Sequence, residues 1–192
     1  MIRVAITGNI ASGKSQVENY LKSLYPVVDT DAITHNLLEQ NQNLIIDAFA
    51  PHKIAENGTI SRKLLGALVF DNPELKTKLE DLLHPQIKTE LQRFFAQHKD
   101  SSLVFASVPL LFEAKFEALF DKIIFIYAPD DIRLKRLMNR NNLSEQDATK
   151  RMNCQASQEE KLSKCDYVIK NDSSKEELLN KLNEILNDLS NF

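Results

Sequence analysis

The chain has little cysteine, no excess of positive charge and no long apolar run, and each shortage excludes a class of function. Its 192 residues carry a formal net charge of −3 and include only two cysteines, Cys154 and Cys165. These have no C-x-x-C spacing and no nearby histidine, which argues against a zinc site and favours reduced thiols. Nucleic-acid-binding surfaces are usually basic, and a membrane-spanning helix needs about 18 consecutive apolar residues. We therefore expect no nucleic-acid or membrane partner and, without a signal-peptide layout at the N-terminus, a cytoplasmic protein.

Five short apolar runs predict the strands of one sheet. They are continuous rather than alternating, as in strands that are buried on both faces of a parallel sheet. Helical patterns separate them, so we expect an α/β layered fold. The runs cover residues 2–7, 25–29, 103–108, 122–127 and 167–169.

Helical segments fill the remaining sequence. The long stretch between the second and third runs contains no good strand and has helical spacing over 61–70 and 73–97. We expect His84-Pro85 to bend or divide the second of these helices, because Pro lacks the N–H group. Residues 130–164 predict further helices with N-terminal caps at Ser144 and Ser157 and a break at Asn141-Asn142. The tail, 174–189, predicts an amphipathic packing helix.

One motif carries most of the chemical information. Residues 8–15 read Gly-Asn-Ile-Ala-Ser-Gly-Lys-Ser, which is a complete G-x-x-x-x-G-K-[ST] between a predicted strand and a predicted helix. In that context the backbone N–H groups and the helix N-terminus converge on one point that suits a phosphate group. Lys14 can reach the β- and γ-phosphates, and the Ser15 hydroxyl can coordinate Mg²⁺. The motif therefore predicts binding of a nucleoside triphosphate.

Two carboxylates follow the second predicted strand. Asp29 and Asp31 come at its end, and ligands of parallel α/β sheets bind at the carboxyl ends of the strands. The third run ends without Asp or Glu, so this pair is the candidate for the acidic partner of the site. One can act on Mg²⁺ or its waters, and the other can accept a proton from an acceptor hydroxyl. Either residue could instead cap the following helix.

Three arginines recur at helical spacing after the fourth run. Arg133, Arg136 and Arg140 fall on roughly one helix face just before the predicted break. Such a face could close over a triphosphate as a lid, since Arg neutralises the charge on a transferred phosphoryl group. The alternative is an ordinary solvated basic face, which we favour for Arg133.

The ordered motifs resemble those of the dephospho-coenzyme A kinases from Ile2 to about Asp172. The phosphate loop, Asp29-Thr-Asp31, the segment from Gly58 to His84-Pro85, Pro109-Leu-Leu-Phe-Glu113, Arg136-x-x-x-Arg140 with Gln155, and Cys165-Asp-Tyr-Val-Ile-Lys-Asn171 all look like family elements. The sequence departs from the usual residues at Asn9 (Gly), Gln16 (Thr), Thr30 (Ala) and Cys165 (Ala). None of these changes removes a charged group, and Asn tolerates unusual φ values, so we expect the loop to keep its shape.

The resemblance implies that ATP phosphorylates the ribose 3′-hydroxyl of dephospho-CoA, with Mg²⁺ as cofactor. We expect the protein to be a monomer. The resemblance also implies one P-loop kinase domain, with core segments at about 1–30, 101–130 and 165–192, a CoA-binding helical insertion at about 31–100 and a lid at about 136–160. Asp31, Lys14 and Arg140 would be catalytic, and Ser15 and Asp29 would hold the metal. ATP would contact Gly8, Asn9, Ala11, Ser12, Gly13, Lys14, Ser15, Gln16, Arg136, Arg140 and Asn171.

The acceptor side of the predicted site leaves more alternatives open. Arg62 suits the pyrophosphate of dephospho-CoA, because a planar guanidinium binds such groups well. His84 and Phe70 are further substrate candidates, although His84 could mark a helix boundary and Phe70 could belong to the core. Glu113 could pair with a lid arginine or serve structure. Another small-molecule kinase shares the loop, the acidic pair and the arginines, whereas a GTPase-like switch would need an Asn-Lys-x-Asp motif that no strand end supplies.

Overall fold

The computed structural model describes residues 1–190, so Asn191 and Phe192 at the end of the expected core segment 165–192 lie outside the described residues. The chain divides into two compact units. One comprises Met1–Asp29 and the residues from Phe94 onward, and the other comprises Thr30–Arg93. No helix in the described range is long and apolar enough to cross a membrane.

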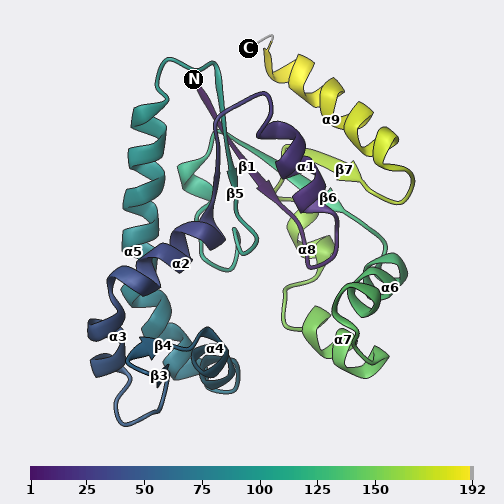
Figure 1. Ribbon diagram of the computed structural model, residues 1–192. Helices are drawn as coiled ribbons and strands as arrows, with labels where there is room; N and C mark the ends of the chain where they lie inside the picture. The colour runs from purple at the N-terminus through teal and green to yellow at the C-terminus, as the bar shows by residue number, and fades with distance from the viewer. Residues whose placement is uncertain (191–192) are drawn as a thin grey trace. The chain divides into compact units, whose positions relative to one another are not determined.

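The first unit is built on a five-stranded sheet of the predicted kind (Figure 1). All four strand pairings are parallel, and the strand order is β2-β5-β1-β6-β7. The five apolar runs are confirmed as strands, although β2 begins two residues later than its run. The strands are β1 (Ile2–Thr7), β2 (Val27–Asp29), β5 (Leu103–Ser107), β6 (Lys122–Tyr127) and β7 (Tyr167–Lys170).

Two helices cover one face of this sheet. Alternate side chains of the strands pack there against α1 (Lys14–Leu21) and the tail helix α9 (Lys175–Ser190), which lie side by side in Figure 1. The tail is therefore the packing helix that its periodicity predicts. The buried residues of this face are Val4, Ile6, Val17, Leu21, Leu103, Phe105, Ile124, Ile126, Ile169, Leu178, Leu182, Leu186 and Leu189.

Three short helices connect β6 to β7, as the capping signals predict. They are α6 (Asp130–Asn141), α7 (Glu145–Met152) and α8 (Gln158–Leu162). Asn142 has a left-handed backbone at the end of α6. The Ser144 and Ser157 hydroxyls accept hydrogen bonds from the first turns of α7 and α8. A single 3₁₀ turn, Glu117–Leu119, precedes β6.

The second unit is helical with one small hairpin. Its helices are α2 (Thr30–Gln40), α3 (Gln42–Ala48), α4 (Arg62–Phe70) and most of α5 (Pro73–Gln97). The expectation of a strand-free segment is wrong, because β3 (Ala55–Glu56) and β4 (Thr59–Ile60) pair antiparallel. Asn57 and Gly58 between them both have positive φ, as the two-residue turn of a tight hairpin requires. The Asn-Gly pair was the sequence signal for this turn.

Pro85 does not divide α5, so this part of the expectation that it bends or divides the helix is wrong. The helix continues without interruption from Pro73 to Gln97. Leu83, Ile87, Leu91 and Phe95 are all buried at a spacing of four residues, so the proline lies inside a continuous apolar stripe. Burial of four large side chains, each worth about 1.5–3 kcal/mol, exceeds the roughly 3 kcal/mol that an internal proline costs.

Candidate active site

The phosphate loop begins where the central strand ends. In the sheet register, Asp29 of β2 pairs with Ser107 of β5, and Ser107 pairs with Ile6 of β1. These three residues form one row at the carboxyl edge, and neighbouring strands lie about 4.8 Å apart. Gly8 follows β1 and Lys14 opens α1, so the loop spans the edge of the sheet that carries Asp29 and Ser107.

Two residues give the loop its left-handed turns. Ala11 has φ +63° and Gly13, the residue before α1, has φ +99°. Asn9 is not in the left-handed region, so the expectation that its tolerance of unusual φ preserves the loop is wrong. Instead, its backbone carbonyl accepts a hydrogen bond from the Ser12 N–H at 3.0 Å, which closes the turn. The Ser12 hydroxyl is buried and has no partner within residues 1–190.

Lys14 is held at the end of β5 by a buried charge network. Its Nζ donates to the Ser107 hydroxyl, which in turn donates to Glu18 Oε2 at 2.7 Å. Glu18 Oε2 also lies 3.5 Å from Lys14 Nζ, and its Oε1 accepts from Lys22 at 2.6 Å. Burial alone would raise the pKa of Glu18, but the hydrogen bonds from Lys22 and Ser107 and the charges of Lys14 and Lys22 hold it below its usual value. The ionised carboxylate therefore fixes the lysine next to the loop.

Glu18 was not identified from the sequence, although a signal was present. Lys14, Glu18 and Lys22 stand four residues apart, which places them on one face of α1. A carboxylate between two lysines at this spacing predicts the ion pairs that the structure shows.

Asn171 and Arg136, which we expected to contact ATP, contact a backbone carbonyl of the phosphate loop. Asn171, which is 2% exposed, donates from Nδ2 to the Ser12 carbonyl at 2.7 Å, and Arg136 approaches the same oxygen at 3.5 Å. Arg133 donates to the Ile10 carbonyl at 3.4 Å and forms an ion pair with Asp130 at 2.8 Å. Arg133 is 3% exposed, so it is not the solvated residue that we favoured.

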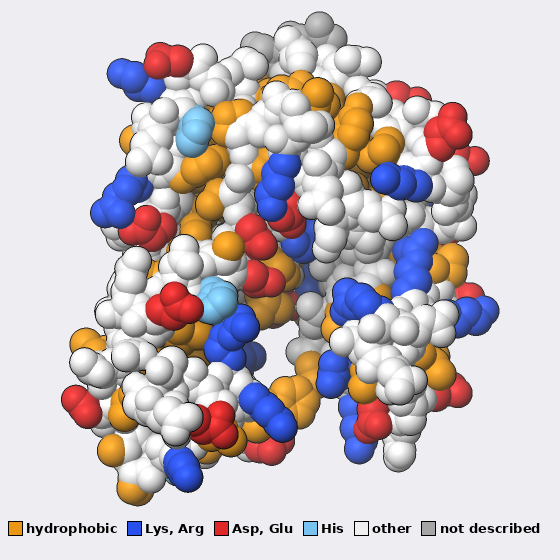
Figure 2. Space-filling view, in the orientation of Figure 1, with side chains coloured by type: hydrophobic (Ala, Val, Ile, Leu, Met, Phe, Trp, Pro, Cys, Tyr) orange, Lys and Arg blue, Asp and Glu red, His pale blue; other side chains and the backbone are white. Residues whose placement is uncertain are grey.

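Arg140 lies apart from these contacts. It is exposed at the end of α6 and donates to the Asn141 side chain at 3.0 Å. Other Lys and Arg side chains gather on the same surface over α6 and α7 (Figure 2). The helices thus offer positive charge beyond the two arginines that contact the loop.

A segment around α8 contacts the first half of the loop. The Gln155 side-chain carbonyl accepts from the Ile10 N–H at 2.7 Å. The Asn9 side chain donates to the Ala156 carbonyl at 2.9 Å and accepts from Lys161 at 2.9 Å. Glu113, for which we left two roles open, pairs with Lys161 at 2.7 Å. Sequence reasoning missed Lys161, because a lysine in a short polar helix carries no signal of burial.

The metal and base candidates lie at the end of β2 and in the first turns of α1 and α2. Asp29 is the last residue of β2 and is half-buried, and Asp31 is exposed in the first turn of α2. Ser15 and Gln16 are exposed in the first turn of α1. Mg²⁺ usually takes one or two protein oxygens together with phosphate oxygens. The hydroxyl of Ser15 and the carboxylate of Asp29 are oxygen donors of that kind.

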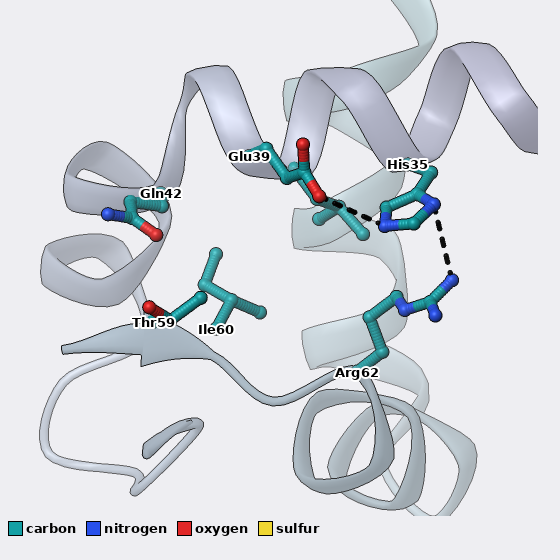
Figure 3. A pocket seen from close by; sticks show the side chains of 7 residues that line it. His35, Glu39, Gln42, Thr59, Ile60 and Arg62 are labelled. Atoms are coloured by element: carbon teal, nitrogen blue, oxygen red, sulfur yellow. Dashed lines mark hydrogen bonds and ion pairs between the residues drawn. The ribbon is translucent and has the colours of Figure 1, made fainter. Parts of the chain in front are cut away.

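The acceptor candidates belong to the second unit. Arg62 and His35 line a small pocket between α2 and β4, and Figure 3 shows them pointing toward one another. Arg62 NH1 lies 3.5 Å from His35 Nδ1, and His35 Nε2 lies 3.1 Å from Glu39. His35 was not identified from the sequence. The guanidinium of Arg62 is exposed and can receive an anionic group.

His84 and Phe70, the other two acceptor candidates, do not line this pocket. His84 is half-buried on α5, and burial lowers its pKa despite the nearby Glu80 carboxylate. Phe70 ends α4 and is 64% exposed, so the alternative that placed it in the core is wrong.

These features define a class of enzyme. A strand, a glycine loop with an anchored lysine and an arginine-bearing helix pair on a five-stranded parallel sheet are the parts of a P-loop kinase. Solved structures agree on the fold: a shikimate kinase from Bacteroides thetaiotaomicron matches with a TM-score of 0.58 at 13% identity, covering 98% of each chain.

The family follows from closer relatives. The family model described as dephospho-CoA kinase matches residues 2–177. A dephospho-CoA kinase of Listeria innocua is 36% identical over 181 residues, or 90% of each chain. The Campylobacter jejuni dephospho-CoA kinase structure matches with a TM-score of 0.73 and 33% identity, covering 98% of this chain and 97% of that one. The crystal structure of TT1252 from Thermus thermophilus matches with a TM-score of 0.88 and 34% identity, covering 98% of this chain and 97% of that one.

The chain therefore belongs to the dephospho-CoA kinase family. It is an ATP-using kinase of dephospho-CoA, and it carries out the final step of CoA biosynthesis. This confirms the resemblance and sets aside the other small-molecule kinases and the switch proteins.

Proposed function

We propose that the ribose 3′-hydroxyl of dephospho-CoA attacks the γ-phosphorus of ATP at the edge of the sheet formed by Asp29 and the phosphate loop. The observation that carries this proposal is the anchored Lys14, which the Ser107–Glu18 network holds beside the loop. A lysine in this place supports the β- and γ-phosphates as a point charge. The bond between the γ-phosphorus and the β–γ bridging oxygen breaks, and ADP leaves with that oxygen.

The loop backbone would hold the phosphates through its N–H groups. The carbonyls of Ile10, Ser12 and Gly13 are bonded to protein donors, which are Arg133, Asn171 with Arg136, and the Gln16 N–H. Because a carbonyl bonded to the protein is not available to repel an anion, this arrangement favours phosphate in the loop.

Mg²⁺ would be held by Ser15 and Asp29 and would neutralise phosphate charge when it is bound. Arg136 and Arg140 would contact ATP phosphates from α6 once nucleotide is present, and we propose residues 136–160 as the lid. Arg136 would have to exchange its 3.5 Å contact with the Ser12 carbonyl for a phosphate oxygen. That contact is at the limit of a hydrogen bond, so little is lost in the exchange.

Asp31 is our candidate for the general base. It stands two residues beyond the end of β2, and its carboxylate is exposed at the first turn of α2. It would take the proton of the 3′-hydroxyl, a step that is worth about 10²–10⁴-fold in rate. On the acceptor side, Arg62 would bind the pyrophosphate of the substrate, and His84 and Phe70 remain weaker candidates for substrate contact.

The Asp31→Asn variant tests this assignment. It keeps the size and hydrogen bonding of the side chain but cannot accept the proton, so kcat should fall roughly 10²–10⁴-fold with ATP affinity unchanged. Asp29→Asn should instead weaken binding of ATP in the presence of Mg²⁺. Asp100→Asn is the matched control, since Asp100 is exposed just before the amino end of β5. Loss of Mg-ATP affinity in Asp31→Asn with kcat preserved would show that the two roles are exchanged.

We also propose that the enzyme works as a cytoplasmic monomer without nucleic-acid or membrane partners. The net charge of −3 provides no attraction for phosphate backbones or anionic lipid. Light scattering after size-exclusion chromatography should give the mass of one chain, 21.9 kDa. A mass of twice that value would contradict the proposal.

A further inference from the structure

A buried lysine reaches the phosphate loop from α8. Lys161 is 2% exposed, and its Nζ donates to Glu113 Oε1 at 2.7 Å and to Asn9 Oδ1 at 2.9 Å. A buried ammonium group is expensive unless it is both paired and hydrogen-bonded. Lys161 therefore ties two segments together: the one after β5, which carries Glu113, and the phosphate loop, which carries Asn9.

Asn9 is fixed at both ends of its amide. Its Oδ1 accepts from Lys161, and its Nδ2 donates to the Ala156 carbonyl at 2.9 Å. The side chain is 3% exposed and cannot choose another rotamer without leaving polar groups unpaired. Its backbone is fixed as well, because the Asn9 carbonyl accepts from the Ser12 N–H. The turn that leads to Ala11 is thus held by contacts outside the loop.

Glu113 shows why the lysine is needed. Its Oε1 accepts from Lys161, whereas its Oε2 is buried and has no hydrogen-bond partner within the described part of the chain. A carboxylate in that state relies on the ammonium for compensation. The pair is therefore poorly suited to stabilise the fold alone, and we look for its role in the side chain that the ammonium group holds, which is Asn9.

We propose that Asn9, Lys161 and Glu113 form a positioning chain that holds the first half of the phosphate loop in its nucleotide-receiving shape. Lys161 is a positioning residue that acts through Asn9, and it touches neither ATP nor the acceptor. Through the Ala156 contact the same chain fixes the start of α8 relative to the loop. The loop is then shaped before nucleotide arrives, and ATP binding does not have to order it.

Asn9→Ala and Lys161→Met test the chain as a double-mutant cycle. Asn9→Ala leaves the Lys161–Glu113 pair in place and removes the two side-chain contacts of Asn9, to Lys161 and to the Ala156 carbonyl. We expect each variant to lower kcat/KM for ATP by roughly 10- to 100-fold, because small misplacements of a binding element have effects of this size. The double variant should be no worse than the more damaging single variant, since both substitutions interrupt one chain. Lys99→Met, at an exposed lysine outside this set of contacts, is the control that should change nothing.

A purely structural role would give a different pattern. Lys161→Met leaves Glu113 uncompensated and should lower the melting temperature, and Glu113→Gln added to it should restore much of that loss. If kcat/KM for ATP recovers together with the melting temperature, the pair serves stability only and the proposal is overturned. Independent, multiplying effects of Asn9→Ala and Lys161→Met would overturn it as well. If Lys161→Met does not fold, Glu113→Gln replaces it in the cycle with Asn9→Ala, and independent, multiplying effects of these two substitutions would overturn the proposal.

Discussion

Replacing Gly13 by Ala should damage the phosphate loop in two separable ways. Gly13 has φ +99°, a backbone conformation that residues with a Cβ adopt at a cost of about 1–2 kcal/mol. An added Cβ would also lie 2.0 Å from Asn171 Nδ2. Asn171 is 2% exposed and donates to the Ser12 carbonyl at 2.7 Å. It cannot move away without losing this bond, so the clash displaces the loop from β7.

The two effects give a magnitude for the prediction. Loss of a buried hydrogen bond leaves a partner unsatisfied and costs about 1–3 kcal/mol. Together with the cost of the backbone conformation, this loss means that Gly13→Ala should lower the free energy of unfolding by roughly 2–5 kcal/mol. For a chain of this size that corresponds to a fall in melting temperature of about 4–20 °C. ATP binding should weaken as well, because Gly13 precedes the first turn of α1.

The other three glycines of the chain serve as controls. Gly66 lies in α4 with nothing within 4 Å of an added Cβ, so Gly66→Ala should stabilise by up to about 1 kcal/mol. Gly58 has φ +78° and open space, so its Ala variant should show the backbone term alone. Gly8 has no positive φ, but its Cβ would meet the Ile126 carbonyl at 2.6 Å, so its variant should show the clash alone.

Urea unfolding followed by circular dichroism measures all four variants. The decisive comparison is Gly13→Ala in an Asn171→Ala background, where the clashing amide is absent. There the variant should cost only the backbone term of about 1–2 kcal/mol. An unchanged cost in that background, or a loss below about 0.5 kcal/mol in the parent chain, would refute the reasoning.

Two further predictions rest on the pKa directions. The folded pKa of Glu18 is lowered, so its carboxylate stabilises the protein above its unfolded pKa, and this stabilisation is lost as the pH falls through the folded pKa. Glu18→Gln should therefore be less stable than the parent at pH 7. The urea midpoints of the variant and the parent should converge as the pH is lowered. A gap that stays constant down to pH 3 would contradict this. Burial, aided by Asp166, raises the pKa of Cys165 to about 11, whereas Cys154 is exposed. At pH 8 the thiolate fraction of Cys165 is about one in a thousand, so a thiol reagent should modify Cys154 first. Equal reaction rates of the two thiols in the native protein would contradict this prediction.

The parts of the fold that could be predicted from the sequence are those set by local pattern. The five parallel strands and the two serine caps follow from apolar runs and from hydrogen-bonding side chains a few residues apart. The phosphate loop follows from eight consecutive residues. The wrong expectations have local explanations too. The Asn57-Gly58 turn signal was overlooked, and Pro85 was judged without the apolar stripe that surrounds it.

The contacts that shape the site could not be predicted in this way. Lys161 is 152 residues from Asn9 in the chain, and Asn171 is 159 from Ser12. Both contacts depend on how α8 and the end of β7 pack beside the loop, and residue types alone do not encode that packing. Sequence spacing placed Arg133 and Arg136 on one helix face but could not say what that face contacts.

The arginines show how the missing contacts change the mechanism. Arg133 is committed to Asp130 and the Ile10 carbonyl, Arg136 approaches the Ser12 carbonyl, and only Arg140 is fully exposed. Within the loop, Asn171 and these two arginines contact the carbonyl oxygens of Ile10 and Ser12. Of these three arginines of α6, Arg133 and Arg136 therefore contact loop carbonyls, and the exposed Arg140 is the one left for the phosphate contact that we propose. The sequence pattern favoured Arg136 and Arg140 for the lid and a solvated position for Arg133, whereas in the structure Arg133 and Arg136 both contact the loop.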